Sequence, residues 1–274
     1  MPRIPEESES HESRGICPLA GRSKSSFRAR RRERSAGLSE LLRDLALANR
    51  ILAHEGVVDA FGHVSVRHPE RAERFVMSRS RSPELVTLDD LMEFTLDGTP
   101  LDARGRTPYS ERFIHGAIYE ARADVGAVVH NHSHAVIPYG VTPVKLRPVL
   151  HVGAAIGAEI PVWDIRRKFG DTSMLVVNIA QARDLAAALG ANRVALMRGH
   201  GCAVAGATLR EAVFTAVYLQ VNAQLQTAAM GLSDQVEYLS AGELALAREM
   251  LSQPVGLDRA WEYWSARADR SGIG

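Results

Sequence analysis

The sequence predicts a single α/β domain preceded by a short leader. Stretches in which apolar residues recur at helical spacing alternate with short apolar runs typical of strands, and no internal repeat is visible. The chain has 274 residues, of which 46% are hydrophobic, so it can bury a substantial core. We therefore expect one folded domain over residues 37–274.

Residues 1–36 are expected to form a disordered basic leader. They are rich in Ser, Glu and Arg, contain the run Arg28–Arg34 and offer few large apolar side chains. Such a segment buries too little surface to offset the entropy lost on ordering. A nucleic-acid tail is the alternative, but a solvated leader or a misassigned start is the favoured interpretation.

The folded part should begin with a helix near Ser39 that ends at Gly56. Thr87 and Asp90 resemble a weak capping box, which predicts one helical turn between two strands. A second capping box at Thr208 should open a long helix. The expected strands are His63–Arg67, Phe75–Arg79, Met92–Leu96, Val125–His132, 174–177 and 194–197, and the further helices are 110–122, 179–189, 208–230, 240–252 and 257–268.

Composition excludes several classes of protein. The formal net charge is +1, which gives the whole chain no broad electrostatic preference for nucleic acid or for an anionic membrane. No apolar run approaches the roughly 18 to 20 residues that span a bilayer, and no secretory signal follows the basic N-terminus. Cys17 and Cys202 are the only cysteines, and Cys17 lies in the leader, so a structural disulfide is not expected. We expect a cytoplasmic protein.

Three histidines carry the strongest chemical signal. His130 and His132 are two residues apart at the end of a buried strand, so both side chains point to the same face. A divalent metal ion accepts both imidazole lone pairs, whereas two buried imidazoles without a partner are costly. His200 has a glycine on each side at the apex of a predicted strand–turn–strand, from which it can reach a neighbouring strand end. Three nitrogen ligands leave an open coordination position, which is typical of a catalytic metal site.

An acidic residue completes a family pattern. Glu111 lies at the start of a predicted helix, where the helix dipole alone would favour a negative charge. However, the order and spacing of Ser110–Glu111, His130–His132 and His200–Gly201 resemble the class II aldolase/adducin superfamily, over roughly residues 38–252. The segment Gly62–Arg67 stands where sugar-phosphate aldolases of this family usually have Gly-Asn-x-Ser.

The resemblance implies a catalytic domain with a central, mostly antiparallel sheet flanked by helices. It also implies a homotetramer with active sites at the subunit boundaries. His130, His132 and His200 would bind zinc or a similar divalent ion, and iron, manganese and cobalt also suit three imidazoles. Glu111 would act as the acid/base and is a further candidate ligand before substrate arrives.

The chain departs from the sugar-phosphate aldolases at the residues that bind phosphate. His63 replaces an Asn, Tyr109 replaces the first Ser of a Ser-Ser pair, and the segment 77–83 contains no glycine. His151-Val152 stands where an aldolase relative has His-Tyr, so the tyrosine proton donor of that relative is absent. A phosphorylated sugar is therefore not the favoured substrate.

Other residues suit a carboxylated substrate. Arg79 and Arg81 are two apart in an extended segment, and guanidinium groups grip carboxylates bidentately, although two solvated surface arginines are the alternative. Three histidines are candidates to bind phenolic oxygens or to supply a proton, each with a structural alternative. The predicted substrate-binding set is Arg79, Arg81, His63, Ser65, Tyr109, Ser110 and His134, with His151 beside Glu111 as a catalytic residue.

The segments around the three histidines resemble the branch of the superfamily that includes dihydroxyphthalate decarboxylases. The predicted function is therefore metal-dependent decarboxylation of a small dihydroxylated aromatic carboxylic acid. Retro-aldol cleavage of a hydroxy-keto acid or sugar phosphate is one alternative, and iron-dependent oxygenation of a hydroxyphenyl acid is another. A non-catalytic adducin-like module is the third, and the retained histidines and Glu111 weigh against it.

Overall fold

The structure, a computed structural model, describes residues 24–270 and divides the chain into two units, 1–38 and 39–274. Helix α1 (Lys24–His54) begins before the predicted start at Ser39, and the frequent Arg and Ala residues of this segment favour a helix. Residues 24–36, which were assigned to the leader, are part of this helix, and the domain boundary at residue 37 stays a prediction. Residues 1–23, including Cys17, lie outside the described part of the chain.

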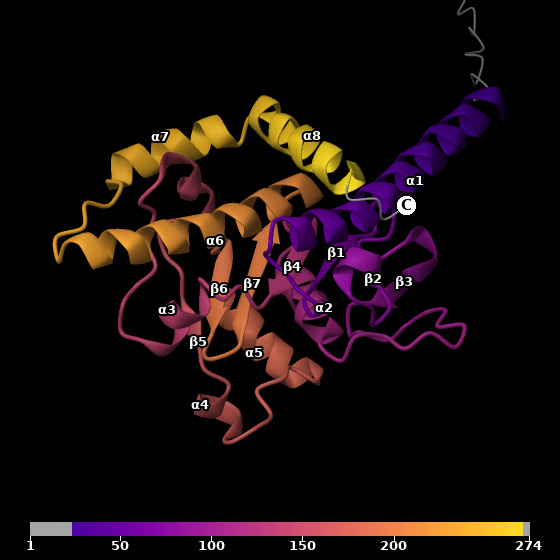
Figure 1. Cartoon of the computed structure of the whole chain (residues 1–274). Helices are drawn as coiled ribbons and strands as arrows, with labels where there is room; N and C mark the ends of the chain where they lie inside the picture. The colour runs from indigo at the N-terminus through magenta and orange to yellow at the C-terminus, as the bar shows by residue number, and fades with distance from the viewer. Residues whose placement is uncertain (1–23, 271–274) are drawn as a thin grey trace, which may run out of the picture. The chain divides into compact units, whose positions relative to one another are not determined.

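A seven-stranded sheet forms the centre of the second unit, in the order β3-β2-β1-β4-β7-β6-β5 (Figure 1). Every neighbouring pair is antiparallel except β5 and β6, so the predicted mostly antiparallel sheet is confirmed. The strands are β1 (His63–Arg67), β2 (Arg74–Ser78), β3 (Leu91–Thr95), β4 (Ala127–Asn131), β5 (Val162–Trp163), β6 (Val194–Met197) and β7 (Gly201–Gly206).

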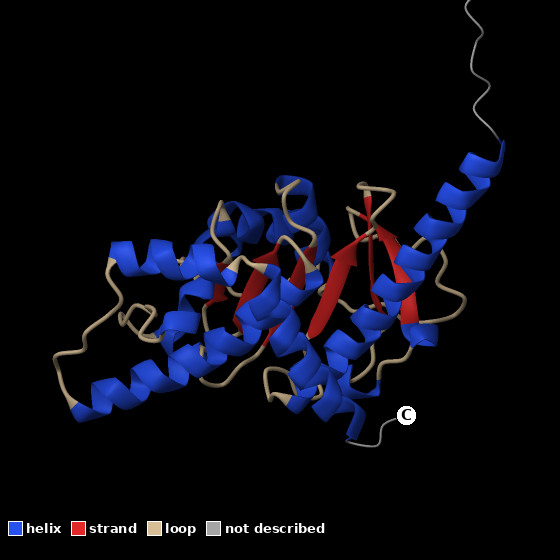
Figure 2. Ribbon diagram, turned by 90° about the horizontal axis from the view of Figure 1, so that it is seen from above, coloured by secondary structure: helices blue, strands red, loops and turns tan. Residues whose placement is uncertain are grey.

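Helices cover both faces of this sheet (Figure 2). They are α2 (Arg112–Ala121), α3 (Ile137–Val141), α4 (Arg166–Phe169), α5 (Ile179–Leu189), α6 (Leu209–Leu232), α7 (Ala241–Leu251) and α8 (Pro254–Arg270), with 3₁₀ turns η1 (Pro83–Leu85), η2 (Leu88–Asp90) and η3 (His151–Ile156). None of the helices in the described residues is long and apolar enough to cross a bilayer.

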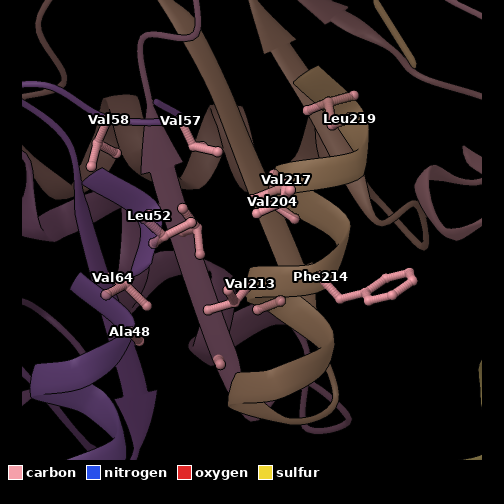
Figure 3. Packing of buried hydrophobic residues seen from close by; sticks show 14 of the residues in the cluster. Ala48, Leu52, Val57, Val58, Val64, Val204, Val213, Phe214, Val217 and Leu219 are labelled. Carbon is pink, nitrogen blue, oxygen red and sulfur yellow. The ribbon is translucent and has the colours of Figure 1, made fainter. Parts of the chain in front are cut away.

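The alternation of side chains along each strand divides the apolar residues between two cores. In β4, Ala127 and Val129 belong to one core, whereas Val128 belongs to the other. The first core packs against α1, α6 and α8, and Figure 3 shows α1 and α6 contributing side chains such as Leu52 and Val213 to it. The second core packs against α2 and α5.

One predicted strand was wrong and one strand was missed. Residues 174–177 do not join the sheet, because side chains satisfy their backbone: Val176 N–H donates to Oε1 of Glu111 at 2.9 Å and Val177 N–H to Oε1 of Gln181 at 2.9 Å. The strand β5 was missed, since two residues are too few to show the alternation of apolar and polar residues that marks a strand. The predicted capping box of Thr87 and Asp90 is present in η2.

Gly201 allows β7 to approach the end of β4, where two of the histidines lie. A Cβ atom at Gly201 would lie 2.1 Å from the carbonyl oxygen of Asn131. Gly201→Ala is therefore expected to lower the free energy of unfolding by about 1–3 kcal/mol, measured by denaturant titration. Gly242→Ala is the control, because the nearest atom there is 3.9 Å away. Equal stability of the Gly201 variant and the wild type would contradict this close approach.

Candidate metal centre

The end of one strand and a distant turn bring three imidazoles together. His130 lies in β4, His132 follows the last residue of β4, and His200 lies in the turn between β6 and β7. Nε2 of His132 is 3.0 Å from Nε2 of His130 and 3.0 Å from Nε2 of His200. The three ring centroids are 4.8 to 5.0 Å apart.

Backbone carbonyl groups determine which ring nitrogens carry the protons. Nδ1 of His130 lies 3.0 Å from the carbonyl oxygen of Cys202, and Nδ1 of His200 lies 3.0 Å from that of Met174. Because a carbonyl oxygen only accepts, both rings donate from Nδ1 and present a lone pair at Nε2. Burial, followed by the neighbouring His130 and His200, lowers the pKa of His132 to about 4. Lone pairs that converge in this way favour a cation between them.

Glu111 directs its carboxylate at the same point. It precedes the first residue of α2 and is 6% exposed. Oε1 accepts from Val176 N–H, while Oε2 lies 3.5 Å from Nε2 of His130 and 3.6 Å from Nε2 of His200. Burial alone would raise the pKa of Glu111, but its interactions with His130 and His200 outweigh burial and hold the pKa well below its usual range.

The four side chains have the spacing that a divalent ion requires. Ligand atoms about 2.0–2.1 Å from one zinc ion in a tetrahedral arrangement lie about 3.4 Å apart. The distances of 3.0 to 3.6 Å between these nitrogen and oxygen atoms are close to that value. Among the side chains that the structure describes, no other group of His, Cys, Asp and Glu is placed to hold a metal ion. Three neutral imidazoles and a carboxylate therefore fit a divalent metal ion.

A cavity of about 440 Å³ opens beside these groups. Its lining includes the predicted residues His63, Arg81, Tyr109, Ser110, Glu111 and His132, together with Phe61 and Leu175, which the sequence did not indicate. A larger hollow of about 740 Å³ near α3 and β5 contains none of the predicted site residues. The smaller cavity is the better candidate for substrate, because Glu111 and His132 of the cluster lie in its wall.

The two arginines that were predicted to hold a carboxylate of the substrate both contact an internal carboxylate. Oδ1 of the buried Asp90 accepts from Nε of Arg79 at 2.6 Å, and Oδ2 accepts from Nη1 of Arg81 at 3.0 Å. Burial raises the pKa of Asp90, but hydrogen bonds from Thr87, Arg79 and Arg81 outweigh it and lower the pKa to about 2. Asp90 thus holds both guanidinium groups in place, and of the two only Arg81 lines the cavity.

Two of the predicted histidines do not line the cavity of this chain. His134 is exposed in a separate hollow that adjoins His132 and Asp59. The strand ends at Asn131, so the alternation of side chains does not extend to His134. His151 is exposed at the start of η3.

Two buried residues near the cavity were missed, His115 and Tyr119. Nε2 of His115 lies 2.6 Å from Nδ1 of His63, and the Tyr119 hydroxyl lies 2.7 Å from Oγ of Ser65. Burial lowers the pKa of His115 to about 3, so the ring is neutral at neutral pH. Their spacing from Glu111 could have indicated them, because residues four and eight positions later lie on the same face of a helix.

The chain is similar to several known proteins. The model of the class II aldolase and adducin N-terminal domain matches residues 43–227. The decarboxylase tropJ of Talaromyces stipitatus is 34% identical over 246 residues, which cover 81% of this chain and 92% of that protein. A 3,4-dihydroxyphthalate decarboxylase of Arthrobacter keyseri is 27% identical over 238 residues, with coverage of 81% and 92%.

A solved structure has the same fold. It is an aldolase II superfamily protein from Pseudomonas syringae, with a TM-score of 0.71 and 24% sequence identity, covering 85% of this chain and 94% of that one.

Proposed function

Because the chain belongs to the class II aldolase and adducin family, we propose that this lyase decarboxylates a dihydroxylated aromatic carboxylic acid in a metal-dependent reaction. The proposal assigns catalysis to residues 37–274. It includes zinc as the metal ion, a homotetramer and a cytoplasmic location. The observation that carries it is the convergence of three imidazole nitrogens and one carboxylate beside a cavity whose wall includes His132, Glu111 and Arg81.

His130, His132 and His200 would hold the metal ion, which supplies a positive charge that polarises a substrate oxygen. Arg81 offers a guanidinium group to the substrate carboxylate, and Phe61 and Leu175 provide apolar surface for a ring.

The reaction requires a proton as well as charge stabilisation. When the bond to the carboxylate carbon breaks, its electron pair stays on the ring carbon, carbon dioxide leaves, and a proton takes its place. We assign the transfer of that proton to Glu111. In support, Val176 N–H binds one carboxylate oxygen, and the other lies 3.5 Å from Nε2 of His130. His151, exposed on η3, is proposed as a donor only to the site of a neighbouring subunit.

The reaction is tested with protein reloaded with zinc. Release of carbon dioxide from 3,4-dihydroxyphthalate or a dihydroxybenzoate, lost on chelation and restored by zinc, is the expected result. Release of an aldehyde from a sugar phosphate without any carbon dioxide from the aromatic acids would overturn the proposal and favour retro-aldol cleavage. Oxygen consumption that depends on iron would overturn it in favour of an oxygenase.

The two arginines provide a matched pair of variants. Arg81→Ala should raise KM about 10- to 100-fold, because a hydrogen bond to a charged group contributes about 1.5–3 kcal/mol. Arg79→Ala should raise KM much less, because Arg79 does not line the cavity. Steady-state kinetics with the same aromatic acid measures both values. Equal effects of the two substitutions would mean that the arginines act through Asp90 and do not contact substrate.

A further inference from the structure

A continuous chain of four buried polar side chains leads from the cavity into the protein. Nδ1 of His63 lies 2.6 Å from Nε2 of His115, and Nδ1 of His115 lies 2.7 Å from Oγ of Ser65. Oγ of Ser65 is in turn 2.7 Å from the Tyr119 hydroxyl. His63 is 3% exposed and the other three are at most 1% exposed, so water does not compete for these hydrogen bonds.

Tyr119, at the inner end, determines the direction of every hydrogen bond in the chain. Among the described residues, the hydrogen-bond partner of its hydroxyl is Oγ of Ser65, at 2.7 Å. Ser65 is therefore the acceptor for the Tyr119 proton. A buried O–H without an acceptor is costly, so Tyr119 donates to Ser65.

The remaining directions follow from the number of protons that each group carries. Ser65 accepts from Tyr119 and donates its single proton to Nδ1 of His115. Neutral His115 therefore carries its proton on Nε2 and donates it to Nδ1 of His63. Since Nδ1 of His63 accepts, the proton of neutral His63 lies on Nε2.

We propose that Tyr119, Ser65 and His115 are positioning residues that hold His63 in the Nε2–H tautomer, so that His63 donates a hydrogen bond to a substrate oxygen in the cavity. The ring of His63 lies 5.0 Å from that of His130. The accepting oxygen therefore belongs to the part of the substrate nearest the metal ligands. A phenolate or carboxylate oxygen is the matching chemistry, because it accepts and does not donate. The identity of the substrate rests on the proposed function, whereas the tautomer does not.

The tautomer is measured directly from the ring ¹⁵N chemical shifts of the zinc-loaded protein, with His63→Gln used to assign the signals. The wild type should show His63 protonated on Nε2, and protonation on Nδ1 would overturn the proposal. Tyr119→Phe removes the hydroxyl and keeps the ring, so both tautomers of His63 should then appear. An unchanged tautomer in Tyr119→Phe would also overturn the proposal. If this variant does not fold, Ser65→Ala breaks the chain at its middle and must give the same result.

Binding of 3,4-dihydroxybenzoate to the zinc-loaded protein tests whether the fixed tautomer of His63 strengthens ligand binding. Tyr119→Phe should weaken binding about 2- to 10-fold, because one net hydrogen bond contributes about 0.5–1.5 kcal/mol. Tyr139→Phe is the matched control, since this buried hydroxyl bonds Ala223 and Thr227 in the other core. Equal weakening in the two variants would overturn the positioning role. Failure to release carbon dioxide would overturn the proposed reaction but would leave the tautomer measurement intact.

Discussion

Replacing His132 with Ala is expected to remove the metal ion and to abolish turnover. Nε2 of His132 lies 3.0 Å from the corresponding nitrogen of each of the other two histidines, so its loss breaks both short contacts of the cluster. Loss of an outer partner of a metal ligand typically costs about 10- to 100-fold in metal affinity, and loss of a ligand should cost more. Metal analysis after dialysis, together with the rate of carbon dioxide release, measures the two effects.

The control for His132→Ala is His54→Ala, which alters an exposed histidine at the end of α1. It should retain metal and turnover. Circular dichroism should show the same helix content in both variants, because His132 lies outside every helix and strand. A His132 variant that retained one metal ion per chain and normal turnover would contradict the ligand assignment.

The elements that carry the histidines could be predicted because their signals are local. Strand alternation places His130 on a definite face, and the glycines around His200 mark a tight turn, with Gly199 at a φ of +62°. The frequent Ala and Leu residues of 179–189 similarly predicted α5, and the capping box at Thr208 predicted the start of the long helix α6. Patterns of this kind depend only on neighbouring residues, so a sequence is sufficient to recognise them.

The partners of the polar side chains could not be predicted, because they come from distant segments. Asp90 was recognised only as part of a capping box, yet it also binds both arginines that were expected to hold substrate. The segment 174–177 resembled a strand, but its backbone is bound by side chains of Glu111 and Gln181. The β1–β4 register, which sets His63 opposite His130, likewise depends on long-range pairing.

Glu111→Gln is expected to lower kcat by about 10²- to 10⁴-fold while zinc remains bound, because general acid–base catalysis contributes about that much. Gln retains an oxygen that can accept from Val176 N–H, and the three histidines are unchanged, so the fold should persist. Glu120→Gln, near the C-terminal end of α2, is the matched control, since Glu120 pairs with Arg183 at the surface and should affect kcat little. Zinc content measured beside kcat separates a role in proton transfer from a role in metal binding. Loss of both zinc and kcat in Glu111→Gln would make Glu111 an essential ligand. A kcat close to that of the wild type would exclude Glu111 as the group that moves the proton, because the side-chain amide of Gln does not act as an acid or a base near neutral pH.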